Sequence, residues 1–113
     1  MKYIITESKI EKIVLKYLDE MFPLKEYRME NHPNVIFFVM DDKVYAEYDT
    51  RDNTFYFSKR LSMSILLDLE KVFDLNYIER YECKDAWFEK LIGGPLINLH
   101  YVETLPLPIE RYK

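Results

Sequence analysis

Five acidic residues gather in the middle of the chain, and two of them share one face of a predicted strand. Glu47 and Asp49 are two positions apart, so their carboxylates point the same way, while Asp41, Asp42 and Asp52 occupy the flanking turns. Carboxylate oxygens at this spacing can bind a divalent cation or divide acid and base roles between them. The simpler interpretation is a solvated strand face whose charges discourage edge pairing.

A metal-dependent nuclease would follow such acids with a Glu-x-Lys strand. Glu82-Cys83-Lys84 matches the Glu-x-Lys pattern, but it lies in a predicted helix and too far along the chain from the acidic group. The other ligand types, His32 and His100 together with Cys83, are too dispersed for a zinc site. We therefore predict no catalytic residue, no metal and no cofactor, and keep metal-dependent chemistry based on the acidic group as a lesser hypothesis.

Length and composition exclude several other classes of protein. The chain has 113 residues, which fits one domain spanning 1–113, and a net charge of −4, so it lacks the basic surface that duplex nucleic acid requires. Its two glycines, Gly93 and Gly94, are adjacent, so no glycine-rich phosphate loop can be written. No window approaches the 18 apolar residues of a membrane-spanning helix, and the N-terminus does not have the pattern of a signal peptide. We expect no membrane as a partner and place nucleic acid behind protein as a partner.

Aromatic residues are abundant, with ten Tyr, seven Phe and one Trp. An A/T-rich genome would produce this bias, and so would a binding surface, since Tyr and Trp are enriched at protein interfaces. The candidates for such a surface are Tyr45, Tyr56 and Trp87. An aromatic sheet face also resembles the platforms that stack single-stranded nucleic acid, but the carboxylates beside Tyr45 would repel phosphate.

A helix opens the predicted order of elements. Ser8 and Glu11 have the spacing of a capping box, and apolar residues then recur in steps of three and four, which predicts a helix from about Lys9 to Phe22. The preceding Tyr3-Ile4-Ile5 is either a short strand or an arm beside this helix.

An antiparallel meander is predicted next. Segments 35–40, 43–49 and 54–58 have strand patterns, and 26–30 could add a short edge strand. Simple alternation in the second of these segments places Val44, Ala46 and Tyr48 toward the helices and turns Tyr45, Glu47 and Asp49 outward.

The second half predicts two helices and an extended end. Ser62 is the expected N-cap of a helix through Phe73, and Asn76 begins another helix that breaks near Asp85, where its apolar stripe is interrupted. Gly93 ends that helix, and segment 96–104 is a last candidate strand.

The C-terminal segment 104–113 is too apolar for a disordered tail, because it carries Leu105, Leu107, Ile109 and Tyr112. It must dock on its own domain, on a second copy or on another protein. We rank docking on its own domain first and include these four residues among the candidate contacts.

Strands grouped between helices predict an α+β fold. The expected architecture is an N-terminal helix, a three- to four-stranded antiparallel meander, then two helices on one sheet face and an extended C-terminal segment. The alternative is a ferredoxin-like βαββαβ sandwich with Tyr3–Ile5 and 97–103 as outer strands.

The opening Met1-Lys2-Tyr3-Ile4-Ile5-Thr6-Glu7-Ser8, running into an amphipathic helix, resembles the start of many small tailed-bacteriophage proteins. The predicted strands Phe37-Phe38-Val39 and Val44–Asp49 are also typical of these phage proteins. The resemblance covers about the first fifty residues, carries no active site, and implies a phage origin in the host cytoplasm or the virion.

These observations predict a non-enzymatic protein-binding module, either a virion or assembly component or an accessory that binds a host protein. Its partner would be another protein or a second copy of the chain. The alternative is a nucleic-acid-associated protein. A metal-dependent nuclease is less favoured than either.

Overall fold

The structure is a computed structural model that describes residues 7–113, with side chains from Ile10 onward, so the strand or arm predicted at Tyr3–Ile5 lies outside the described residues. Helix α1 (Glu7–Met21) begins two residues before the predicted Lys9, which places Ser8 inside the helix and not at its N-cap. Its buried stripe contains Val14 and Leu18, both without solvent exposure.

The predicted antiparallel meander is confirmed. It consists of β1 (Lys25–Met29), β2 (His32–Met40), β3 (Lys43–Asp49) and β4 (Thr54–Ser58), each paired with the next. Strand β2 starts three residues earlier than the sequence pattern predicts, because the chain turns tightly at 30–31 and Met29 pairs directly with His32.

Helix α2 (Lys59–Phe73) follows β4 without a loop. The prediction that Ser62 is its N-cap is wrong: the N-cap is Ser58, whose hydroxyl accepts from the Leu61 amide at 3.2 Å. Ser62 lies one turn into the helix and is buried. The four-residue shift arises because the strand runs straight into the helix, so the last strand residue supplies the cap.

Helix α3 (Tyr77–Ile92) starts after the predicted Asn76, which forms a capping box with Glu79, and ends at Gly93 in a left-handed conformation with φ of 74°. The predicted break near Asp85 is wrong, since the helix is continuous. Lys84, which interrupts the apolar pattern in the sequence, is fully buried and so continues the inward face. None of the helices within residues 7–113 is long and apolar enough to cross a membrane.

The C-terminal part completes the sheet. Strand β5 (Asn98–Val102) lies parallel to β4, β6 (Leu107–Pro108) pairs with the start of β3, and the 3-10 helix η1 (Ile109–Tyr112) follows. The strand order is therefore β1-β2-β3-β4-β5, with β6 beside β3 where β4 has already left the sheet.

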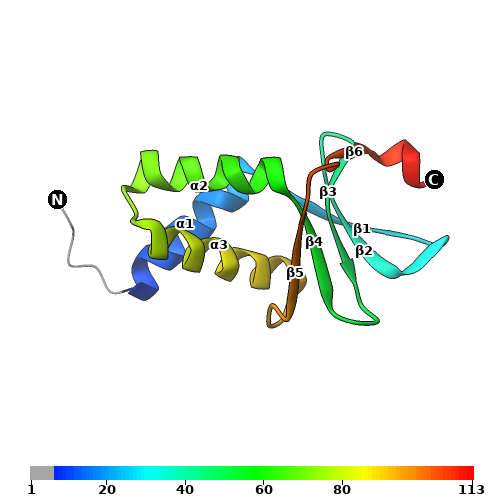
Figure 1. Ribbon diagram of the computed structural model, residues 1–113, viewed down its shortest axis with the longest axis horizontal. Helices are drawn as coiled ribbons and strands as arrows, with labels where there is room; N and C mark the ends of the chain where they lie inside the picture. The colour runs from blue at the N-terminus through cyan, green and yellow to red at the C-terminus, as the bar shows by residue number, and fades with distance from the viewer. Residues whose placement is uncertain (1–6) are drawn as a thin grey trace.

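Figure 1 shows the three helices on one side of the sheet and η1 on the opposite side. The α+β class and the predicted order of helix, meander, two helices and C-terminal segment are confirmed. The ferredoxin-like alternative does not describe residues 7–113, because α2 and α3 follow each other with no strand between them.

Two apolar cores lie on the two faces of the sheet. The larger packs the helices against the sheet and contains Phe55, Phe57, Trp87 and Phe88, all without solvent exposure. The smaller lies on the outer face, where the C-terminal segment covers the strands, and consists of Phe37, Val44, Leu105 and Ile109. The continuous apolar run of β2 supplies both cores, as a strand covered on two faces must.

A β-bulge in β3 divides that strand between the two cores. Phe38 pairs with Ala46 and Val39 with Val44, so Tyr45 is an extra residue on its strand. Val44 therefore faces the outer core while Tyr45 and Ala46 lie against the helix-side core. The simple alternation predicted for this strand, with Val44 and Ala46 on one face and Tyr45 outward, is wrong for this reason.

The turn between β2 and β3 offers a direct test of local backbone strain. Asp41 and Asp42 both have positive φ, 54° and 61°, where side chains other than glycine are disfavoured. Asp42→Gly relieves the second of these and removes one of two adjacent negative charges. We expect it to raise the free energy of unfolding by about 0.5–1 kcal/mol in urea titrations.

Asp52→Gly is the matched control, because Asp52 is not among the positive-φ residues and its carboxylate accepts from the Thr54 amide at 3.1 Å. That variant should be destabilised. If Asp42→Gly and Asp52→Gly lowered the free energy of unfolding equally, backbone strain at Asp42 would be refuted.

Candidate functional site

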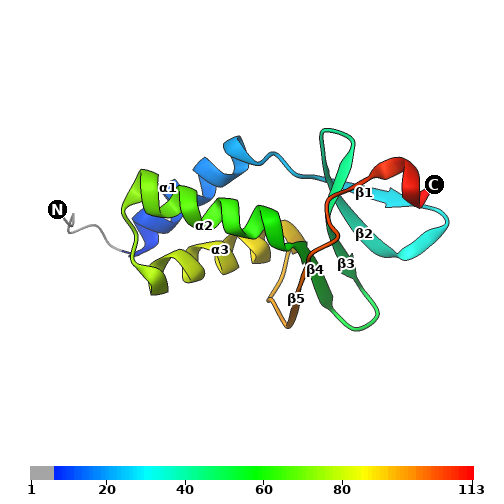
Figure 2. The same cartoon turned by 45° about the horizontal axis from the view of Figure 1, so that its top comes forward.

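Residues 105–112 of the C-terminal segment 104–113 cross the outer face of the sheet, the face that the helices leave open (Figure 2). The Ser58 hydroxyl donates to the Leu105 carbonyl at 3.0 Å, and the Ile109 amide donates to the Asp42 carbonyl at 2.9 Å. Leu105 and Ile109 are buried. The segment thus docks on its own domain, the first of the three alternatives that the sequence left open.

Tyr112 anchors the end of this segment. Its hydroxyl donates to Glu47 Oε2 at 2.9 Å, and its carbonyl accepts from Asn31 Nδ2 at 2.9 Å and lies 3.1 Å from His32 Nε2. Its ring packs edge-on against Phe37 with 5.0 Å between centroids. Burial and the bond to Glu47 raise the pKa of the Tyr112 phenol, so it stays a neutral donor at ordinary pH.

A pocket of about 210 Å³ opens between the C-terminal segment and the strands beneath it. Glu47 and Tyr56 lie directly opposite each other on β3 and β4, and the ring of His100 stacks on Tyr56 at 5.7 Å and 22°. The residues that line the pocket are Glu47, Tyr56, Val102, Thr104, Leu105, Leu107 and Tyr112. Four of the seven contact residues predicted from sequence, namely Tyr56, Leu105, Leu107 and Tyr112, are thus brought to one place.

The charge in this pocket is that of Glu47. Its carboxylate accepts from the Tyr112 hydroxyl, and it forms no ion pair with any side chain in the described part of the chain. Tyrosine rings and aliphatic side chains surround it. A cation suits such a place, because it gains Coulomb attraction to the carboxylate and attraction to the negative ring faces.

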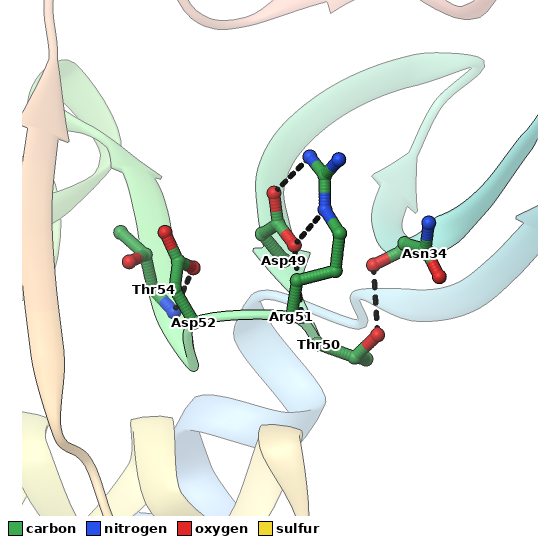
Figure 3. A network of polar contacts seen from close by, with 6 residues as sticks. All are labelled: Asn34, Asp49, Thr50, Arg51, Asp52 and Thr54. Carbon is green, nitrogen blue, oxygen red and sulfur yellow. Dashed lines mark hydrogen bonds and ion pairs between the residues drawn. The ribbon is translucent and has the colours of Figure 1, made fainter.

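Two other residues of the acidic group, Asp49 and Asp52, bind groups of the adjoining turn (Figure 3). Asp49 forms a two-pronged ion pair with Arg51, at 3.1 Å and 2.8 Å, and the guanidinium holds the pKa of that carboxyl below its ordinary value. Beside them the Thr50 hydroxyl donates to the Asn34 carbonyl at 3.0 Å.

Because Asp41 and Asp42 sit at the opposite turn of β3, the five acids do not converge. Among residues 7–113, no group of three or more His, Cys, Asp or Glu side chains is arranged to hold a metal ion.

Three predicted contact residues do not line the pocket. Trp87 is fully buried among the helices, and its indole donates to Asp19 Oδ1 at 2.9 Å, which leaves it no surface for a partner. Tyr45 is half-buried on the helix side of the sheet because of the bulge. Ile109 is buried in the outer core that supports the pocket.

Lys84 is a buried titratable group that the sequence analysis did not select. It is fully buried, its ammonium donates to the Tyr101 hydroxyl, and Ser62 Oγ lies 3.5 Å away. The rings of Tyr101 and Tyr81 lie 4.4 Å and 4.6 Å from the amine. Burial lowers the pKa of Lys84 to about 8, with Asp85 acting in the opposite direction. A lysine inside an otherwise apolar stripe was the signal that could have revealed it.

The neighbouring Cys83 is also buried, and burial together with nearby glutamates raises the pKa of its thiol to about 11. A thiol with such a pKa is a poor nucleophile near neutral pH. Cys83 therefore belongs to the packing of α3 and not to a reactive site.

No protein-family model matches the chain, and neither the curated proteins nor the solved structures contain a significant match to it.

Lys84 makes stability depend on pH in a window that can be measured. The unfolded chain keeps this proton up to a pKa of 10.5, whereas the folded chain releases it near pH 8. Because the unfolded state binds more protons between these values, the free energy of unfolding should rise with pH there, by at most about 3 kcal/mol. Lys84→Met should lack this rise.

Urea titrations between pH 7.5 and pH 10 measure the effect, and Lys71→Met, which removes an exposed lysine of α2, should keep the wild-type profile. Parallel curves for wild type and Lys84→Met would show that the buried amine does not titrate in this window.

Proposed function

We propose that the chain is a non-enzymatic protein-binding module, and that the pocket under the C-terminal segment holds an arginine or lysine side chain of its partner. The observation that carries the proposal is Glu47, a half-buried carboxylate without an ion pair in the described part of the chain, walled by Tyr56 and Tyr112. The pocket volume of about 210 Å³ suits one long side chain.

The construction of the pocket supports recognition by contact. Its floor is paired sheet and its roof is held by Tyr112 at both the hydroxyl and the carbonyl, so little ordering is required when a ligand enters. Thr104 and Tyr56 add hydroxyl groups beside the carboxylate. An aliphatic stem would lie along Val102 and Leu107 while its charged end meets Glu47.

The resemblance of the first fifty residues to tailed-phage proteins favours a phage origin. On that basis the partner is either a virion protein or a host protein, and the protein acts in the host cytoplasm or the virion. Single-stranded nucleic acid is the less favoured partner, because the Glu47 carboxylate, which has no ion pair in the described part of the chain, lies directly opposite Tyr56 on the outer face.

The pocket can be tested with N-acetyl-arginine amide as the probe. We expect saturable chemical-shift changes at the amides of Glu47, Tyr56 and Tyr112, and a weakening of about tenfold or more in Glu47→Gln, because a charge-assisted bond is lost. N-acetyl-citrulline amide, which has the same shape without the charge, should bind more weakly than the arginine probe.

Glu20→Gln is the matched control, since it removes an equal charge from an exposed side chain of α1, which packs on the other face of the sheet. It should leave arginine binding unchanged. Equal binding of the arginine and citrulline probes, or equal binding by wild type and Glu47→Gln, would refute the proposal that the pocket binds a cationic side chain through Glu47.

A peptide-display selection on the full chain tests the protein-binding role itself. Peptides enriched on wild type and depleted on Glu47→Gln should share a basic residue. Enrichment of peptides that lack Arg and Lys, or no enrichment at all, would count against a module of this kind.

A further inference from the structure

Strand β1 is an open edge of the sheet. It pairs with β2 on one side only, and no strand within residues 7–113 lies on its other side. Four of its five residues, Lys25 to Arg28, are exposed, so neither the helices nor the C-terminal segment covers them. Such an edge presents unpaired backbone groups that another strand can bind.

The side chains on this edge carry both signs of charge. Glu26 and Arg28 pair with Phe38 and Ile36 of β2, so both lie on the helix-side face of the strand. Neither has a hydrogen bond or ion pair with another side chain in the described part of the chain. Tyr27 lies on the opposite face and is 42% exposed.

Read in the antiparallel direction, Lys25-Glu26-Tyr27-Arg28-Met29 is complementary to itself. A two-fold axis at Tyr27 places Glu26 of each copy opposite Arg28 of the other and sets the two Tyr27 rings across from each other. Both Glu–Arg pairs then lie on one face, and cross-strand pairs of opposite charge favour pairing. A shift by one residue in either direction loses this match.

The surroundings of the edge fit such a pairing. A groove of about 520 Å³ lies at the start of β1. It is lined by Pro23, Tyr27, Val39 and Met40 and by the charged Lys25, Glu26, Asp41 and Asp42. In the register centred on Tyr27, Met29 of the second copy lies opposite Lys25, at the rim of this groove. An isologous contact of this kind closes on itself and leaves no strand edge at the interface.

We infer that β1 pairs with β1 of a second copy of this chain, antiparallel and centred on Tyr27, to form a homodimer with one continuous sheet. The inference rests on the edge and its charges and is independent of the Glu47 pocket, which lies beneath the C-terminal segment.

Charge reversal tests both the partner and the register. Glu26→Arg places Arg opposite Arg in both symmetry-related pairs, and Arg28→Glu places Glu opposite Glu, so each variant alone should dimerise at least about tenfold more weakly. An equimolar mixture of the two variants restores both pairs of opposite charge and should dimerise as wild type does. Light scattering and sedimentation over a concentration series up to about 1 mM measure the mass.

Lys16→Glu, which reverses an exposed charge on α1, is the control and should dimerise as wild type. Far-ultraviolet circular dichroism verifies that each variant is folded, and the mixing experiment does not depend on either variant dimerising alone. A wild-type chain that stays monomeric up to about 1 mM would overturn the inference. Dimers unaffected by both reversals, or single variants not rescued by mixing, would also overturn it.

Discussion

The extra residue in β3 determines how the whole sheet is covered. Because Tyr45 forms a bulge opposite the bond between Phe38 and Val39, the strand turns Val44 to the outer face and Ala46 toward the helices. Apolar side chains then lie on both faces, and each face requires its own cover. The helices cover one, and the only apolar segment left after α3 and β5, residues 105–112, covers the other.

The pocket is a consequence of that second cover. The C-terminal segment pairs with β3 only at Lys43 and Val44, where β4 has already left the sheet, and then bends into η1. Near Glu47 and Tyr56 the segment is not packed directly on the strands, and the pocket lies between them. The Glu47 carboxylate is therefore half-buried because residues 105–112, more than fifty positions away in the chain, cover it.

Sequence reasoning predicted the order of the elements because periodicity, caps and turns are local. The helix start at Asn76 and the helix end at Gly93 are examples, and both are confirmed. It missed the cap at Ser58 for a local reason, since β4 runs directly into α2. It was wrong where tertiary packing decides, because the bulge at Tyr45 and the burial of Lys84 depend on neighbours distant in sequence. For the same reason it selected Tyr56 and the C-terminal residues but could not associate them with Glu47 and Thr104 in one pocket.

The claim on which the pocket depends is that residues 105–113 are part of this domain and not a free tail. Its most direct test is the free energy of unfolding of a chain that ends at Thr104, measured in urea against the full chain. Exposing Phe37 and Val44, now 1% and 0% exposed, should lower that free energy by about 3 kcal/mol or more, and synthetic peptide 105–113 should restore part of it. An unchanged free energy of unfolding in the shortened chain would contradict the account.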